Sequence, residues 1–75
     1  MRKIKVNGYV FELDEDQTMY ECRGNVCYDD EHDEVPDPVL WKATNKLVDI
    51  LAEKGIKAVA DYSEKGWQEV QFIKN

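Results

Sequence analysis

The dipeptide Asn7-Gly8 constrains this sequence most, because it stands between two segments in which apolar and polar residues alternate. Both central residues of a type I′ turn need positive φ, and Asn-Gly meets that need at little cost. A two-residue loop fixes the pairing of the flanking strands as Val6 with Tyr9, Ile4 with Phe11, and Lys3 with Glu12. The sequence therefore predicts a hairpin over residues 3–13 with five apolar side chains on one face: Ile4, Val6, Tyr9, Phe11 and Leu13.

A helix is predicted to begin at Asp37 and to end before Gly55. Asp37 suits the N-cap position, and Pro38 suits the first helical position. Lys54 and Gly55 form a typical stop signal, a cation near the carbonyl end followed by a residue free to adopt positive φ. Apolar residues recur between these limits at helical spacing: Leu40, Trp41, Ala43, Leu47, Val48, Ile50 and Leu51.

A closing hairpin is predicted from residues 56–62 and 67–73, joined by Ser63-Glu64-Lys65-Gly66. A type I turn with Gly66 in the bulge position pairs Ser63 with Trp67, Ala60 with Val70, and Ala58 with Phe72. This register gathers apolar residues on one face, at the cost of the like-charge pair Asp61–Glu69, which must then be exposed. The second face keeps three rather apolar residues: Val59, Trp67 and Ile73.

The middle of the chain alternates less regularly. Residues 14–17 are expected to form an exposed turn. A second hairpin is expected to run from Thr18 to Arg23, through a Gly24-Asn25 turn, and on to Asp29. Residues 29–38 are acidic and contain two prolines, which disfavour helix in the preceding residues, so they are expected to form a loop before the helix.

These elements predict an α+β fold of order ββ(ββ)αββ. We expect a single small domain over residues 1–75, with an antiparallel sheet built from two or three β-hairpins and one α-helix packed on one face. Seventy-five residues are too few for two hydrophobic cores.

The net charge of −6 is concentrated in one third of the chain. Residues 12–37 hold eleven acids against the single base Arg23. Such a field repels nucleic-acid phosphate and favours cationic partners, so direct nucleic-acid binding is not expected. No segment approaches the roughly 20 apolar residues of a membrane span, and the start of the chain lacks the apolar run of a signal peptide. The mean hydropathy is −0.66, and we expect a cytoplasmic protein that does not bind membranes.

Cys22 and Cys27 bracket the expected Gly24-Asn25 turn, which would place them directly opposite each other. A disulfide would fit that geometry. A metal site that adds His32 is a further alternative, although common zinc sites use cysteines two residues apart and need a fourth ligand. The third interpretation, and the one favoured, is two reduced thiols packed as small apolar groups.

No cofactor motif is present, and catalysis is not expected. All four glycines are assigned to turns or caps, so no glycine-rich phosphate loop is left. The acidic surroundings of the cysteines disfavour a reactive thiolate. Weak, unspecific binding of divalent cations by the acidic loop is expected at most, because the loop lacks the glycine and the spacing of a calcium-binding loop.

Two groups of residues are candidates for partner binding. One is the acidic loop; the other is the second face of the closing hairpin, where tryptophan beside aliphatic residues is typical of an interface. The members are Asp29, Asp30, Glu31, Asp33 and Glu34 in the loop, and Val59, Trp67 and Ile73 on the face.

The sequence thus favours a small acidic non-enzymatic module that binds a protein partner or itself. A sharper variant is an inhibitor or regulator that presents carboxylates where a partner expects phosphates. The alternative is a metal- or redox-responsive domain centred on Cys22, Cys27 and His32.

Overall fold

The N-terminal hairpin has the predicted register in a computed structural model, which describes residues 2–63 and 66–73. Strand β1 (Lys3–Val6) pairs antiparallel with strand β2 (Tyr9–Leu13), with the residue partners expected from a two-residue loop. Asn7 and Gly8 both have positive φ, 51° and 86°. The local turn chemistry and the alternation of the two strands therefore agree.

Strand β3 (Met19–Arg23) pairs with β2 on one side and with β7 (Trp67–Phe72) on the other. Strand β6 (Ala58–Tyr62) completes an antiparallel sheet of order β1-β2-β3-β7-β6. The expected hairpin over residues 18–29 is therefore wrong. The alternation in this part of the chain is irregular because its two halves belong to different sheets.

The sequence predicted a turn at Gly24, and this prediction is wrong. Its N–H donates to the carbonyl oxygen of Gly66 at 2.8 Å, which extends the pairing of β3 with β7 by one step. A Cβ atom at this position would lie 2.6 Å from Cδ2 of Leu40 and 3.1 Å from Oδ2 of Asp37. A glycine is needed here because the backbone passes close to the start of the helix.

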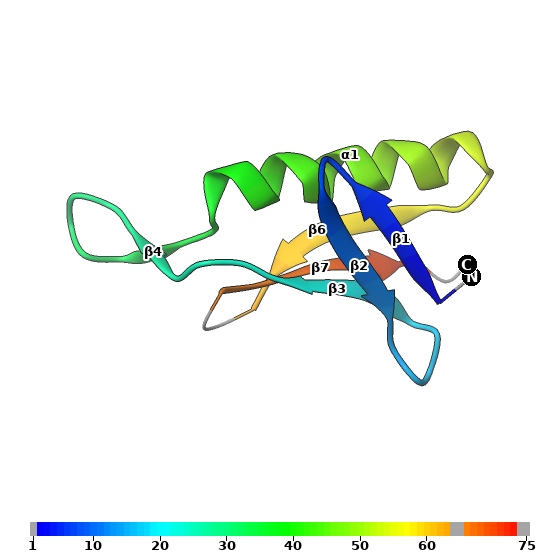
Figure 1. The fold of residues 1–75 in the computed structure, drawn as a ribbon, viewed down its shortest axis with the longest axis horizontal. Coiled ribbons are helices and arrows are strands. Elements are labelled where there is room, and N and C mark those ends of the chain that lie inside the picture. Colours follow the sequence, from blue (N-terminus) through cyan, green and yellow to red (C-terminus); the bar gives the residue numbers. More distant parts are fainter. Residues whose placement is uncertain (1, 64–65, 74–75) are drawn as a thin grey trace.

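Beyond Gly24 the chain leaves the sheet and forms a separate two-stranded hairpin. Strands β4 (Cys27–Tyr28) and β5 (Glu34–Val35) pair antiparallel. The acidic segment 29–38 is therefore not a loop throughout, because it contains β5. In Figure 1 this hairpin extends away from the body of the molecule, at the end where the helix begins.

Helix α1 (Pro38–Glu53) has the predicted boundaries. Asp37 is its N-cap and Pro38 its first residue; Lys54 is its C-cap, and Gly55 follows with φ of 81°. The helix buries one residue that the periodicity did not include, Thr44, whose hydroxyl donates to the carbonyl oxygen of Leu40 at 2.8 Å. That bond satisfies the hydroxyl and allows its burial.

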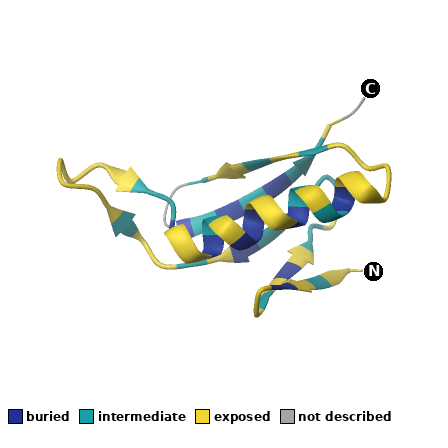
Figure 2. Ribbon diagram, turned by 90° about the horizontal axis from the view of Figure 1, so that it is seen from above, coloured by how far each residue is buried: buried dark blue, intermediate teal, exposed yellow. Residues whose placement is uncertain are grey.

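The helix covers one face of the sheet, over β6 and β7 and beside β1 (Figures 1 and 2). The core between them is apolar except for a few buried polar side chains.

The closing hairpin has the predicted pairs, including Ala60 with Val70 and Asp61 with Glu69. Of its predicted turn, Glu64 and Lys65 lie outside the described residues, and Gly66 has φ of 86°. The protein is thus a small α+β domain of the predicted class. Its buried apolar residues are Val6, Phe11, Tyr20, Cys22, Leu40, Ala43, Leu47, Leu51 and Val70.

Candidate functional site

The face of the sheet that points away from the helix is open. Along β7 the exposure alternates, with Gln68 and Val70 fully buried under the helix and Trp67, Glu69 and Gln71 half-buried on the other side. Among the described residues, the one helix packs on the opposite side of this sheet (Figure 1). We call this surface the open face.

Four carboxylates cross the open face in a single row, one from each of four neighbouring strands. Glu12 stands opposite Glu21, Glu21 opposite Glu69, and Glu69 opposite Asp61. Side chains directly opposite each other have Cβ atoms roughly 4.5–5.5 Å apart, and like charges at that distance destabilise a sheet. We call these four residues the carboxylate row. At the β1 end of the row, Lys3 stands opposite Glu12.

Glu21 lies inside the carboxylate row and is half-buried. Burial raises its pKa above the ordinary value of 4.5, and the negative charges of Glu69 and Asp14 raise it further. The fold therefore holds this carboxylate in a place that disfavours its charged form. A cation that approached this row would relieve the repulsion.

The strain on Glu21 predicts a pH-dependent gain in stability when the charge is removed. At pH 7 the variant Glu21→Gln should unfold with a free energy higher by on the order of 0.5 kcal/mol. The raised pKa means that the folded wild type takes up a proton at higher pH than the unfolded chain, so its stability rises as the pH falls through that pKa toward 4.5. The difference between variant and wild type should therefore shrink over this range.

Urea denaturation at several pH values between 7 and 4.5 measures this difference, with the exposed helix residue Glu53 changed to Gln as the control. A Glu21→Gln difference that stayed constant with pH would contradict the repulsion within the carboxylate row.

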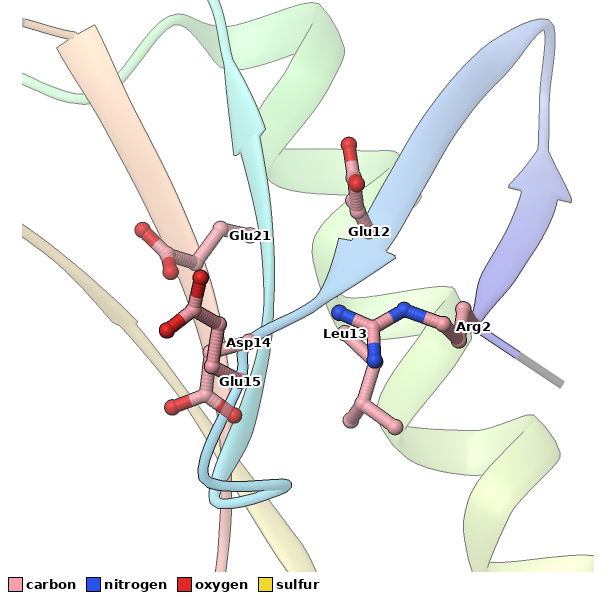
Figure 3. Close-up of a pocket in the computed structure, with 6 residues that line it drawn as sticks. All are labelled: Arg2, Glu12, Leu13, Asp14, Glu15 and Glu21. Carbon is pink, nitrogen blue, oxygen red and sulfur yellow. The ribbon is translucent and has the colours of Figure 1, made fainter.

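A shallow pocket of about 350 Å³ opens at the β2–β3 end of the row. Its walls carry several carboxylates, one guanidinium group and one apolar side chain, and Figure 3 shows Arg2 on one side with Asp14, Glu15 and Glu21 on the other. Asp14 also accepts hydrogen bonds from the N–H and the hydroxyl of Thr18, which lower its pKa and keep it ionised. The pocket is therefore suited to a cationic side chain. The lining residues are Arg2, Glu12, Leu13, Asp14, Glu15 and Glu21.

Trp67 lies on the open face beside the carboxylate row, next to Arg23. The two residues are cross-strand partners, and the guanidinium carbon of Arg23 lies 5.6 Å from the centroid of the indole ring. This cation–π contact holds the indole over the sheet and leaves it half-buried rather than covered. Val59 and Ile73 share the open face and are 49% and 51% exposed. The sequence-predicted face of Val59, Trp67 and Ile73 is thus present and uncovered by any described element.

The projecting hairpin carries the predicted acidic residues at its tip. Asp29 organises this tip: its Oδ1 atom accepts from the N–H of Glu31 and of Asp33, each at 2.9 Å. Its own N–H donates to the carbonyl oxygen of Asp33, and His32 closes the turn with φ of 64°. These bonds close the tip of the hairpin around Asp29. We call residues 27–35 the acidic finger.

The finger is fastened at its base by Asp37. Oδ2 of Asp37 accepts from the N–H of Asn25 at 3.2 Å and from its side-chain amide at 3.4 Å, while Oδ1 caps the helix through Val39 and Leu40. Burial alone would raise the pKa of Asp37, but these hydrogen bonds together outweigh it and lower the pKa. Two exposed apolar side chains lie on the finger or at its base, Val26 and Tyr28, at 42% and 61% exposure.

The structure does not place Cys22 opposite Cys27. Cys22 lies in β3, buried in the core opposite Gln68, whereas Cys27 begins the finger, and both are free thiols. The predicted cross-strand geometry for a disulfide is therefore wrong, since it depended on the hairpin over residues 18–29. Within residues 2–63 and 66–73, no three side chains of His, Cys, Asp or Glu gather to hold a metal ion. Cys22, Cys27 and His32 are accordingly not brought together.

The different positions of the two thiols predict different reactivity. Iodoacetamide should label Cys27 at least about tenfold faster than Cys22 in the folded protein, because Cys22 is 8% exposed and burial raises its pKa. Mass spectrometry of timed aliquots measures both rates, and Cys27→Ser should remove the fast phase. In denaturant the two rates should converge. Equal rates in the folded protein would contradict the burial of Cys22 in β3.

The sequence did not predict the carboxylate row as a site, although it predicted two of the residue pairs that belong to it. The pairs Lys3–Glu12 and Asp61–Glu69 follow from the two hairpin registers. Glu21 joins them only through the pairing of β3 with β2 and β7, which links segments about fifty residues apart.

Comparisons with protein-family models, with curated proteins and with solved structures gave no match. In the part of the chain that the structure describes, no helix has the length and apolar character needed to cross a bilayer.

Proposed function

We propose that this protein is a small non-enzymatic interaction module that binds a basic surface of a protein partner. The observation that carries the proposal is the carboxylate row on the open face, four acids in register across adjacent strands. Such an arrangement costs stability in the free protein. A partner that supplies lysine or arginine side chains along the row would convert this repulsion into attraction.

Trp67 supports a binding role for the same face. Tryptophan is among the residues that most often dominate the energetics of protein interfaces, and it does so when a partner buries it fully. Here the indole is half-buried, and Arg23 holds its orientation at 5.6 Å. A partner that covered Trp67 would gain apolar contact at a position already fixed, which lowers the entropic cost of binding.

The acidic finger adds a second group of carboxylates. Strand β3 leads from the sheet toward the finger, and Trp67 begins β7 opposite Arg23, the last residue of β3. The finger therefore carries one acidic group and the open face another, with the Arg23–Trp67 pair at the end of β3 from which the chain continues to the finger. A basic groove on the partner is the complement, and an inhibitor of a nucleic-acid-binding protein is the sharper form of this proposal.

The charge also favours a different protein over a second copy of this chain. Two copies that met through this surface would bring together two chains of net charge −6. We propose a cytoplasmic setting, which two free cysteines support, since disulfides are rare where thiols are kept reduced.

Quantitative affinity capture from cell extract tests the proposal with variants of matched charge. The row variant carries Asp61→Lys and Glu69→Lys, and the finger variant carries Asp30→Lys and Glu31→Lys. The control carries Asp49→Lys and Glu53→Lys, which change the charge equally on the exposed side of α1. Trp67→Ala is a further variant. The wild type and the control should retain the partner, and the amount captured should fall at least about tenfold with the row, finger and Trp67 variants.

The captured partner is then purified and its affinity is measured between 50 mM and 0.5 M salt. The affinity should fall steeply as salt is added, because 0.5 M salt screens the attraction between exposed charges that lie more than a few ångströms apart. Binding that survived 0.5 M salt unchanged, or that the control variant reduced as much as the row variant, would refute the proposed role of the carboxylate row.

A further inference from the structure

The two edges of the five-stranded sheet differ in how they are protected. At the β1 edge, Lys3 and Lys5 lie on the strand itself, and edge lysines discourage the addition of another strand. The other edge strand, β6, has the sequence Ala-Val-Ala-Asp-Tyr, with no lysine or proline within the strand; Lys57 stands just before it. In the described parts of the chain, no strand pairs with the outer side of β6 (Figure 2).

The hydrogen-bond pattern shows which backbone groups of β6 face outward. On either side of β6, the N–H of Ser63 donates to the carbonyl oxygen of Trp67, and the carbonyl oxygen of Lys57 accepts from the N–H of Ile73. Since backbone groups alternate in direction along a strand, the odd-numbered residues of β6 bond to β7. In an antiparallel ladder the intervening residues point the other way. Ala58 and Ala60 therefore direct both their N–H and C=O groups to the outside. Tyr62 does so only with its C=O group, because its N–H donates to Oδ1 of Asp61 at 2.8 Å.

The carboxylate row reaches this edge and ends there without a base. At the β1 end, Lys3 closes the row against Glu12; at the β6 end, the last member is Asp61. A strand added to β6 would place one residue directly opposite Asp61. Because Asp61 bonds to β7, that pair would be of the non-hydrogen-bonded kind, in which side chains approach most closely.

The helix side of the same edge is apolar. Ala58 and Ala60 are half-buried under α1, and Trp41 meets Tyr62 edge to face with ring centroids 5.9 Å apart. Residues of an added strand that point to this side would lie beside small aliphatic and aromatic groups. The edge therefore favours a segment whose residues on the helix side are apolar and whose residue opposite Asp61, on the open face, is basic.

We propose that β6 is a docking edge for an extended basic segment of a protein partner, which adds to the sheet as a sixth strand. Its lysine or arginine lies opposite Asp61 and closes the carboxylate row as Lys3 does at the other end. This inference rests on the proposed function and names the part of the basic partner that is recognised. Backbone hydrogen bonds to Ala58 and Ala60 provide the register, and Asp61 provides the selection for charge.

The probe is the capped peptide acetyl-Thr-Val-Lys-Val-Thr-Val-Thr-amide, whose antiparallel docking places lysine opposite Asp61 and the following valine opposite Ala60. One control peptide has glutamate for lysine, and another is N-methylated at that valine, which removes a hydrogen bond to Ala60. Amide exchange by NMR follows Ala58 and Ala60. The parent peptide should slow their exchange at least about tenfold at saturation, and N-methylation should weaken binding about tenfold. Asp61→Lys should reverse the preference from the lysine to the glutamate peptide.

The outcomes separate this inference from the proposed function. If the N-methylated peptide bound as well as the parent and Ala58 and Ala60 stayed unprotected, edge docking would be refuted while basic binding to the open face stood. If both amides were protected but lysine and glutamate peptides bound alike, strand addition would be supported, and the charge selection that the proposed function requires would be refuted.

Discussion

Replacing Asp37 with alanine should lower the free energy of unfolding by about 3 kcal/mol, which is large for a domain of this size. The carboxylate performs two structural tasks. Oδ1 accepts from the N–H groups of Val39 and Leu40 at the start of the helix, and Oδ2 accepts from Asn25 at the base of the acidic finger. Loss of an N-cap costs about 1 kcal/mol, and loss of buried hydrogen bonds to a charged group costs about 1.5–3 kcal/mol.

Urea denaturation followed by circular dichroism measures this loss, with Asp49→Ala on the exposed side of the helix as the control. Asp37→Asn should recover roughly half of it, since asparagine also caps helices. Because hydrogen bonding lowers the pKa of Asp37 in the folded state, its contribution is present above the ordinary pKa of 3.8 and disappears as the pH falls through the lowered value. Asp37→Asn should lack this acid-side loss. A cost below 1 kcal/mol for Asp37→Ala would contradict the double role.

Replacing Gln68 with methionine should raise the free energy of unfolding by about 1–2 kcal/mol. Gln68 is fully buried on the helix side of β7, between Cys22 and Tyr62 on the neighbouring strands. Neither Oε1 nor Nε2 has a hydrogen-bond partner among the described residues. A buried amide without partners costs its desolvation free energy, and methionine fills a similar volume without polar atoms that need hydrogen bonds.

The control is Gln71→Met. Gln71 lies half-buried on the open face, two positions after Glu69 in β7, and this change should alter the free energy of unfolding by less than about 0.5 kcal/mol. Thermal and urea denaturation of both variants give the comparison. Destabilisation by Gln68→Met would show that the amide has partners in solution and that it contributes to the core. Stabilisation would make this position a direct means of strengthening the fold for work on the open face.

The local elements of this fold could be predicted from the sequence because their signals are local. Asn7-Gly8 sets the first hairpin, Asp37 and Gly55 bound the helix, and the register of the closing hairpin follows from burying its alanines together. Each of these inferences uses residues within about twenty positions of one another. The same reasoning placed Val59 and Trp67 on a face away from the helix, which the structure confirms.

The pairing of β3 could not be found in this way, because glycine has more than one structural use. Gly24 followed by Asn25 resembles a turn, yet Gly24 lacks a side chain in order to pass Leu40 and Asp37. Nothing in the residues next to β3 indicates β7 as its neighbour. The carboxylate row depends on that pairing and was therefore beyond the sequence, whereas the acidic finger was visible as a charge cluster but not as a hairpin.

The place of β3 in the centre of the sheet has a consequence for the rate at which the molecule folds. Either terminal hairpin closes a short loop, an event on the order of microseconds. The contact of β3 with β7, by contrast, joins residues 19–23 to residues 67–71 and requires the intervening chain to be closed into a loop. Chains whose core depends on such distant contacts fold more slowly than chains built from local ones. We therefore expect the pairing of these two central strands to limit the rate at which the core, and with it the open face, forms.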